Sequence, residues 1–598
     1  MTKLIRLPLI ALILCICASK TQGVNPDFEF LENTQSELPL RRLEETLPCD
    51  DIVATWSLET LMELTNNVIN RTFEGSEVVI LQGALLSVMK YGVQIRKICS
   101  SCKEMGMHEE EMHKEYCTTN NYGYNLTQSG LLLLPIDADT GSIHQGTMPA
   151  VLYNHPSVLR EAPTVWFGED SNILLFLNLV VASTGVINIM PDYLGYGGYD
   201  DAGFWDNIAY KAYLIKKGYQ TSIMPLWYKT AQIIQRDSKC ASALGNAVSI
   251  FGYSEGGYVS VAMADTMYKA GINVVHVDAG GAPIDLETTV YMMVKTVDNS
   301  EFPVGQRYFL ALIGNSFSST YPDIPSYQKQ NMLNSTSKEV IRAILFNSTE
   351  PNSTGVRDQI FQAVPEGDLL SIVDLNSLAL IRSYIVQGLE TSHPCNATAV
   401  VGENDLLCQA FIENTLTESV LTAQYPIRFC HSQDDKVVHI ANVPADLSGN
   451  PNLEFIAATG DHSEAGQYCL LQALIYLTRS GIANTDMSKV STGLCDDQTL
   501  PGAPNSASTI PSPISQPTNS VPQVATTNAP LESSSSIPVS PSSPAIPLAP
   551  TLTPTSRTSE GSRQRNTWLW TGVVLGVSSL AVLVVYVKVT RFRRTATR

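Results

Sequence analysis

Residues 248–258, VSIFGYSEGGY, are the stretch that decides the fold of this chain. A β-branched and apolar run leads into a Gly-x-Ser-x-Gly turn, and a helical pattern follows with Gly271 placed as its C-terminal cap. Only small residues fit a turn this tight, so Gly252 and Gly256 flank Ser254 and allow its hydroxyl to project above a sheet. A strand, a sharp turn and a helix in this order predict a nucleophile elbow.

Buried-strand patterns recur on both sides of this turn. The candidate strands are 129–135, 150–153, 186–190, 274–279, 426–430 and 454–456, and a helical pattern covers 172–183. Strands that alternate with helices over such a length predict an α/β fold with a largely parallel sheet flanked by helices. Residues 59–68 and 78–93 carry apolar residues at mixed spacings and are left unassigned.

The N-terminal residues carry the features of a secretory signal. Lys3 and Arg6 form a basic start, and an apolar run over 7–17 precedes small residues. Because that run is too short to span a bilayer, residues 1–23 are predicted to be a signal peptide. The polar and acidic segment 24–48 is interpreted as a tether or a pro-segment.

The C-terminal part predicts a membrane anchor. Residues 498–562 are rich in Pro, Ser, Thr and Ala and contain no aromatic residue, so they cannot bury a core and are interpreted as a stalk. Residues 568–587 carry no charge, and a helix of this length spans about 30 Å. The basic segment 588–598 then forms a short cytoplasmic tail. The chain is therefore expected to be a single-pass type I membrane protein of the secretory pathway, with its folded part extracellular or lumenal.

Charge, cysteines and sequons agree with a secreted protein. The formal net charge of −19 argues against a nucleic-acid partner, since phosphate binding needs clustered Lys and Arg. Ten of the twelve cysteines remain once Cys15 and Cys17 leave with the signal, which allows up to five disulfides of undetermined pairing. The predicted N-glycosylation sites are Asn70, Asn125, Asn334, Asn347, Asn352 and Asn396.

The strand patterns also divide the folded part. Residues 49–285 form the N-terminal part of the core, and residues 423–497 form its C-terminal part, where the strand pattern returns. Residues 286–422 lie between them and carry helical patterns. An insertion at this point of an α/β sheet lies at the carboxyl ends of the strands, so the segment is predicted to be a helical cap or lid domain.

Three residues in a fixed order predict the chemistry. A serine hydroxyl is a poor nucleophile until an imidazole takes its proton, and a carboxylate must hold that imidazole in one tautomer. Asp435 and His462 each follow one of the last two candidate strands, in the order Ser, Asp, His expected after Ser254. Asp434 is the alternative carboxylate, but Val438 is well placed to pack the turn formed by Asp435.

Two backbone N–H groups are candidate oxyanion donors. The first belongs to Glu255, at the start of the helix that follows the nucleophile. The second belongs to the loop after the strand 150–153, and since Pro156 has no N–H it would be that of Ser157. The alternative interpretation of the second loop is an ordinary turn.

Taken together, these motifs resemble the secreted lipases and esterases of the α/β-hydrolase superfamily known from fungi and bacteria. The similar stretches are 129–135, 191–197, 248–258, 281–285, the Asp435 turn and the His462 loop, within about residues 125–480. The resemblance implies a capped α/β sheet with no metal and no organic cofactor. By this resemblance, Ser254, Asp435 and His462 correspond to the family's catalytic triad, and Glu255 and Ser157 correspond to its oxyanion donors.

The chain departs from the family in two ways. It has His155-Pro156 where the family usually has His-Gly, and it carries a tether where the family's lipases are free secreted enzymes.

Three functions follow from these features. The favoured one is a membrane-tethered serine hydrolase that cleaves small-molecule or lipid esters through an acyl-enzyme on Ser254. The alternatives are a serine peptidase and a catalytically silent adhesion or receptor module, because one fold carries many functions. Such silent modules typically lack the nucleophile, whereas Ser254 is present here together with both expected partners.

Overall fold

The computed structural model describes residues 50–72, 85–100, 128–158, 173–194, 212–298, 307–321 and 406–479, together with a few single positions between them. The chain divides into two compact units, residues 1–509 and 510–598, and all of the described residues belong to the first.

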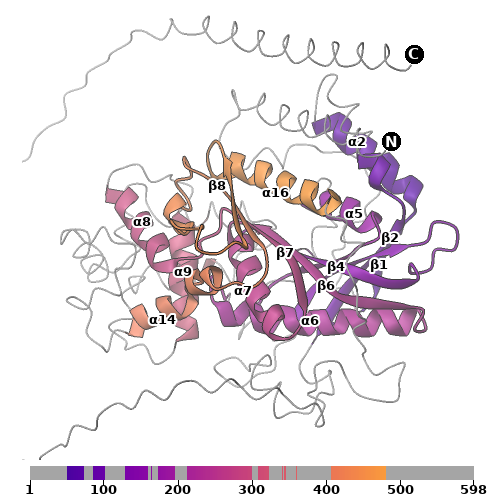
Figure 1. Cartoon of the computed structure of the whole chain (residues 1–598), viewed down its shortest axis with the longest axis horizontal. Coiled ribbons are helices and arrows are strands. Elements are labelled where there is room, and N and C mark those ends of the chain that lie inside the picture. The colour runs from indigo at the N-terminus through magenta and orange to yellow at the C-terminus, as the bar shows by residue number, and fades with distance from the viewer. Residues whose placement is uncertain are drawn as a thin grey trace, which may run out of the picture. The chain divides into compact units, whose positions relative to one another are not determined.

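A mixed sheet forms the centre of this unit (Figure 1). Its nine described strands have the order β1-β2-β3-β5-β4-β6-β7-β8-β9. Their bounds are β1 Ile52–Trp56, β2 Gly92–Ser100, β3 Gln128–Ile136, β4 Gly146–Asn154, β5 Ile187–Pro191, β6 Ser242–Tyr253, β7 Asn273–Gly280, β8 Ile427–Ser432 and β9 Leu453–Ala458. The pairs from β5 to β9 are parallel, and β1, β2, β3 and β5 pair antiparallel. The predicted α/β fold with a largely parallel sheet is confirmed.

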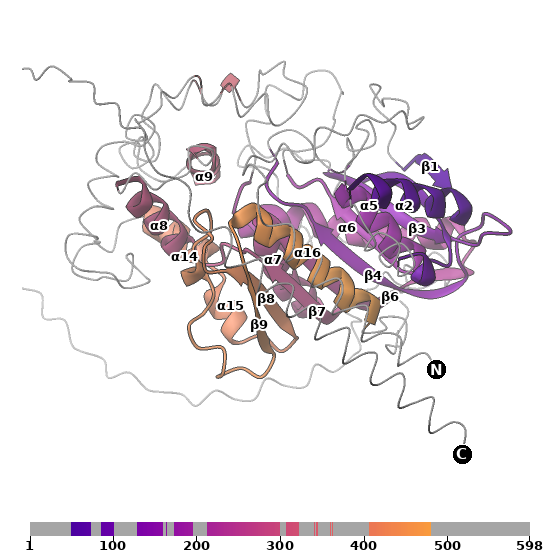
Figure 2. The same cartoon turned by 90° about the horizontal axis from the view of Figure 1, so that it is seen from above.

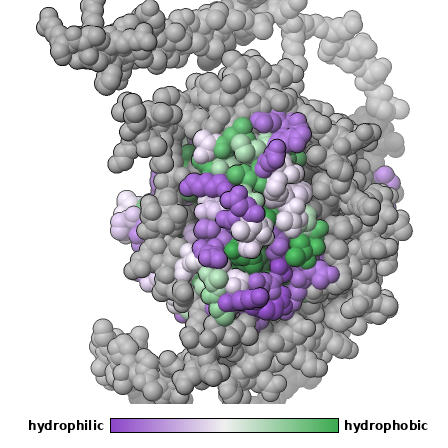
Figure 3. Space-filling view, turned by 90° about the vertical axis from the view of Figure 1, so that its right-hand side faces the viewer, coloured by the Kyte–Doolittle hydropathy of each residue, from purple (hydrophilic) through white to green (hydrophobic). Residues whose placement is uncertain are grey.

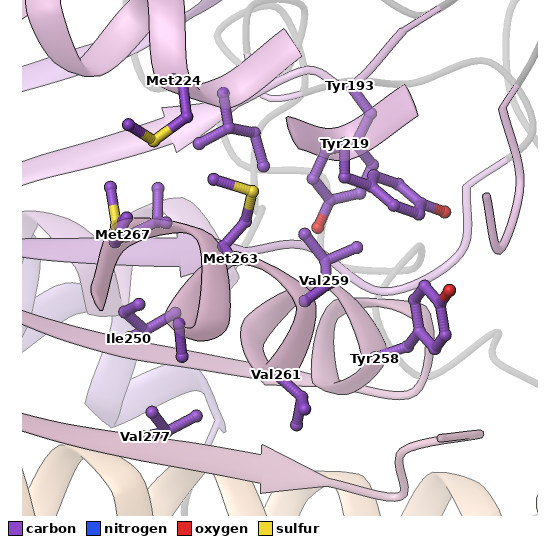
Figure 4. Packing of buried hydrophobic residues seen from close by; sticks show 14 of the residues in the cluster. Tyr193, Tyr219, Met224, Ile250, Tyr258, Val259, Val261, Met263, Met267 and Val277 are labelled. Carbon is purple, nitrogen blue, oxygen red and sulfur yellow. The ribbon is translucent and has the colours of Figure 1, made fainter. Parts of the chain in front are cut away.

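Helices cover both faces of the sheet. One face packs against α2 (Leu58–Thr72), α5 (Ile173–Ser183) and α16 (His462–Arg479), and the other against α6 (Lys216–Asp237) and α7 (Glu255–Lys269) (Figure 1). Alternate residues of one strand enter the two cores, since Leu131 and Leu133 face α5 while Leu132 and Leu134 face α6. Figure 4 shows the core on the α6 side of the sheet, where Met263 and Met267 of α7 lie between Met224 of α6 and Ile250 of β6.

The strands β1 and β2 and the helices α2, α6 and α16 were not predicted. In β2 the polar residues Gln94, Arg96 and Lys97 interrupt the apolar pattern, yet every residue of the strand is buried. α6 covers this part of the sheet, and Arg96 forms an ion pair with Asp237 at the end of that helix.

Figure 3 views the molecule from the right-hand side of Figure 1, where hydrophilic and hydrophobic residues are interspersed.

The described parts of the predicted cap, 286–422, are helical. They are α8 (Leu286–Asp298), α9 (Arg307–Thr320), α14 (Leu406–Asn414) and α15 (Thr417–Leu421). α8, α9 and α14 gather beyond the same end of the sheet in both views (Figures 1 and 2). Phe309, Phe317 and Phe411 belong to the same hydrophobic cluster as α6 and α7, so these helices pack against the core. Their role as a cap stays a prediction.

Several predicted features lie outside the described residues. These are the signal peptide 1–23, the segment 24–48, the stalk 498–562, the membrane span 568–587, the tail 588–598 and the sequons at Asn125, Asn334, Asn347, Asn352 and Asn396. Asn70 lies in the last turn of α2. Of the helices that are described, none is long and apolar enough to cross a membrane. The disulfide Cys430–Cys469 joins β8 to α16, and Cys99 and Cys240 are also disulfide-bonded.

Candidate active site

The predicted elbow joins β6 to α7. Ser254 occupies the turn with φ +58°, a backbone conformation that is rare for a residue with a side chain and is typical of functional sites. A Cβ on Gly252 would overlap the backbone of Gly256, and a Cβ on Gly256 would overlap the carbonyl oxygen of Asn154. Both glycines therefore allow the elbow to lie directly against the end of β4.

Ser254, His462 and Asp435 form a continuous hydrogen-bonded chain. Ser254 Oγ lies 2.9 Å from His462 Nε2, and His462 Nδ1 lies 2.7 Å from Asp435 Oδ2. The three residues are 6% exposed or less, although they come from β6–α7, from the loop after β8 and from the start of α16. Since an ionised Asp435 can only accept, His462 Nδ1 donates to it and leaves Nε2 free to accept the serine proton.

Asp435 is held in place by its own loop. Its Oδ1 accepts hydrogen bonds from the backbone N–H groups of Val437 and Val438, each at 2.9 Å, so only Oδ2 is directed to His462. Burial alone would raise the pKa of Asp435, but the nearby His462 and the hydrogen bonds outweigh it and lower that pKa. Asp434, the alternative carboxylate, is exposed.

A second histidine lies beside the carboxylate. His431 is buried in β8, with Nε2 donating to the carbonyl oxygen of Val438 at 2.7 Å and lying 3.5 Å from Asp435 Oδ2. Burial lowers the pKa of His431 and the charge of Asp435 only partly opposes this, which favours the neutral ring. His431 thus packs against the Asp435 turn and holds it through the hydrogen bond to Val438.

Glu255 is the first residue of α7 and is buried beside Ser254. Its carboxylate Oε1 accepts a hydrogen bond of 2.7 Å from the hydroxyl of Tyr219 on α6. The Tyr219 hydroxyl oxygen in turn accepts a hydrogen bond from the backbone N–H of Leu214. The residue predicted as the first oxyanion donor is therefore fixed by its side chain to the start of α6.

Ser157 lies in the loop after β4, where its Oγ is 2.9 Å from the hydroxyl of Tyr213. The same loop is held at His155, whose ring stacks on Tyr193 with centroids 3.9 Å apart. The Tyr193 hydroxyl also donates to the carbonyl oxygen of His155 at 3.0 Å. Because the Tyr193 and Tyr219 rings meet edge to face, the two candidate donor regions share one aromatic support (Figure 4).

The supporting residues Tyr193, Tyr219 and His431 were not predicted from the sequence. Tyr193 stands within a motif that was recognised, but a tyrosine in such a motif carries no signal for the partner that its hydroxyl reaches. The described residues contain no group of three or more His, Cys, Asp or Glu side chains arranged to hold a metal ion.

Comparison with known proteins identifies the fold. No protein-family model and no curated protein sequence matches the chain significantly. Among solved structures, a candidate hydrolase from Legionella pneumophila aligns with a TM-score of 0.51 and 16% identity, covering 74% of this chain and all of the other. A ligand-bound form of the rice cell wall degrading esterase LipA from Xanthomonas oryzae aligns with a TM-score of 0.50 and 17% identity, covering 73% and 98%. This chain therefore has the fold of the α/β-hydrolases, the superfamily that its sequence motifs resemble.

Proposed function

We propose that this chain is a serine hydrolase that cleaves carboxylic esters through an acyl-enzyme on Ser254. The observation that carries the proposal is the hydrogen-bonded chain from Ser254 through His462 to Asp435, with heavy-atom distances of 2.9 and 2.7 Å. Distances in this range are those at which a base takes a proton from a nucleophile and a carboxylate orients the base.

In the proposed reaction, His462 Nε2 takes the hydroxyl proton while Ser254 Oγ attacks the carbonyl carbon of the ester. Asp435 stabilises the imidazolium that forms, and the backbone N–H groups of Glu255 and Ser157 are the proposed donors to the oxyanion. His462 then protonates the departing alcohol. A water molecule, deprotonated by the same histidine, releases the acid and restores Ser254.

The setting of the enzyme is also a proposal. The residues that support it are the basic and apolar start at 1–23, the stalk composition of 498–562 and the uncharged run 568–587. They favour a hydrolase held at a membrane by one C-terminal helix, with the catalytic unit extracellular or lumenal and residues 286–422 covering the site. Small-molecule or lipid esters are then the proposed substrates, and no cofactor is required.

Hydrolysis of a graded series of p-nitrophenyl esters, from acetate to palmitate, tests the proposal. The full chain should hydrolyse at least one ester, and Ser254→Ala should lose about 10⁶-fold in kcat, as expected when a triad nucleophile is removed. A matching series of peptide p-nitroanilides separates the esterase from the peptidase. Equal rates for the wild type and Ser254→Ala on both series would contradict the proposal and favour the adhesion module.

A further inference from the structure

We infer that Tyr253, the residue immediately before the nucleophile, is a positioning residue that ties the strand carrying Ser254 to the helix carrying His462. The inference rests on the proposed function, since it assigns the part that Tyr253 plays in the same reaction. The Gly-x-Ser-x-Gly turn does not specify the residue that precedes the serine, so the side chain at this position can serve to position the base.

The contacts of the Tyr253 hydroxyl are with the proposed base. Tyr253 Oη donates a hydrogen bond of 2.6 Å to the backbone carbonyl oxygen of His462, and it lies 3.4 Å from His462 Nδ1. The two rings also pack against each other, with centroids 4.9 Å apart. Residues 209 positions apart in the chain are thereby joined next to the bond between Ser254 and His462.

The surrounding chain leaves room for this ring through three glycines. A Cβ on Gly280 would lie 2.6 Å from Tyr253 Cδ2, one on Gly281 would lie 2.7 Å from Cζ, and one on Gly466 would lie 2.8 Å from Cε1. Real Cβ atoms essentially never approach another atom so closely. Glycines from the end of β7 and from α16 therefore form a slot for the tyrosine, which is 5% exposed.

The environment keeps the hydroxyl protonated and able to donate. Burial, together with the charges of Asp435 and Asp461, raises the pKa of Tyr253 well above its usual value. The disulfide Cys430–Cys469 belongs to the same small hydrophobic cluster as Tyr253, so α16 is also tied covalently to β8 in this cluster.

Losing this bond should affect catalysis more than binding. Misplacement of a catalytic group by a fraction of an ångström lowers the rate steeply, whereas Tyr253 is directed to the base and its role requires no contact with substrate. For Tyr253→Phe we expect kcat to fall about tenfold, the loss that corresponds to one hydrogen bond, while KM stays within about twofold.

The experiment compares the full-length wild type with Tyr253→Phe, Gly466→Ala and the control Tyr425→Phe. Tyr425 is also a buried tyrosine, but its hydroxyl has no hydrogen-bond partner among the described residues. Ester hydrolysis gives kcat and KM, the rate of labelling by a fluorophosphonate probe gives the reactivity of Ser254, and thermal unfolding shows whether each variant is folded. Gly466→Ala displaces the Tyr253 ring without removing its hydroxyl, so it tests the inference independently.

We expect Tyr253→Phe and Gly466→Ala to lower kcat and the labelling rate together, while Tyr425→Phe behaves as the wild type. The inference is overturned if folded Tyr253→Phe keeps kcat within twofold of the wild type, or if KM alone changes. If Tyr253→Phe fails to fold, a Gly466→Ala variant with full kcat overturns it instead. A wild type that neither labels nor hydrolyses esters contradicts the proposed function itself, which is a distinguishable result.

Discussion

At the scale of single residues, the site depends on how completely each polar atom is used. One carboxylate oxygen of Asp435 accepts hydrogen bonds from two backbone N–H groups, and the other accepts one from His462. The carboxylate therefore cannot rotate away without losing these hydrogen bonds, and their loss would leave a buried carboxylate without partners. His462 is oriented in the same manner, by Asp435 at Nδ1 and by Tyr253 at its backbone carbonyl.

Replacing Asp435 by Asn should lower kcat by about 10⁴-fold while the chain stays folded. The amide would place an NH₂ group against His462 Nδ1 and favour the tautomer whose Nε2 carries a proton and cannot accept one from Ser254. Asp434→Asn is the matched control, because Asp434 is exposed and adjacent. Steady-state ester hydrolysis measures kcat for both variants. A larger loss for Asp434→Asn would show that Asp434, and not Asp435, is the acid.

The two buried groups of this turn should make stability depend on pH in separate windows. The pKa of His431 is lowered from 6.5, so the unfolded chain takes up a proton that the folded chain refuses, and stability falls as pH drops below 6.5. The pKa of Asp435 is lowered from 3.8, so the stability it contributes is complete above 3.8 and is lost as pH falls through the lower, folded value.

Urea unfolding at a series of pH values separates the two contributions. His431→Gln should flatten the dependence between about pH 7 and 5, and Asp435→Asn should flatten it only below about pH 4. A His431→Gln variant whose free energy of unfolding declines between pH 7 and 5 as steeply as that of the wild type would contradict the assignment.

At the scale of elements, the elbow works because two backbones touch. The carbonyl oxygen of Asn154, at the end of β4, occupies the space that a Cβ on Gly256 would need. Gly256→Ala should therefore push α7 from the loop that carries Ser157, costing about 1–3 kcal/mol of stability and most of the activity. Gly449→Ala is the control, since Gly449 is exposed and has ordinary backbone geometry. Thermal unfolding and kcat together test this, and an unchanged Gly256→Ala enzyme would refute the close approach.

The helix that begins with His462 is anchored ten residues from its start by Arg428, which also forms a buried ion pair within the sheet. Arg428 of β8 bonds Asp278 of β7 and the carbonyl oxygen of Gln472, and its guanidinium lies 4.7 Å from the centre of the Tyr476 ring. Arg428→Met should cost about 3–5 kcal/mol, because it removes the cation on the buried Asp278 carboxylate and leaves only the His276 ring, 3.1 Å away, beside it. Arg428→Met with Asp278→Leu should recover part of that loss. Denaturant unfolding measures both, and equal losses for the single and double variants would exclude the pairing.

Elements with an uninterrupted apolar pattern could be predicted from the sequence, and elements stabilised by distant partners could not. The prediction for β3 as 129–135 is within one residue of the strand, and Gly271 ends the helical segment with φ +79° as expected of a C-terminal cap. β2 was missed because its polar residues are buried only by elements distant in the sequence, as Arg96 is by α6. The elbow and the hydrogen-bonded residues Ser254, His462 and Asp435 could be predicted from local motifs, whereas the Tyr253–His462 bond joins residues 209 positions apart.

At the scale of the whole molecule, the proposed anchor separates catalysis from membrane attachment. A chain truncated after residue 562 loses the uncharged run 568–587 and should move from the detergent phase to the aqueous phase on phase partitioning, with kcat on a soluble ester unchanged. Enzymatic removal of N-glycans should increase its electrophoretic mobility, as expected of a lumenal unit with six sequons. Full-length chain that partitions into the aqueous phase would contradict the anchor.

The most direct test of the central claim is fluorophosphonate labelling of the full chain, read by mass spectrometry of the peptide that contains residue 254. The probe reacts with an activated serine and requires no knowledge of the substrate. The account predicts one adduct on Ser254 in the wild type, none in Ser254→Ala, and strongly slowed labelling in His462→Ala. A folded wild type that stays unlabelled, or an adduct that persists in Ser254→Ala, would contradict it.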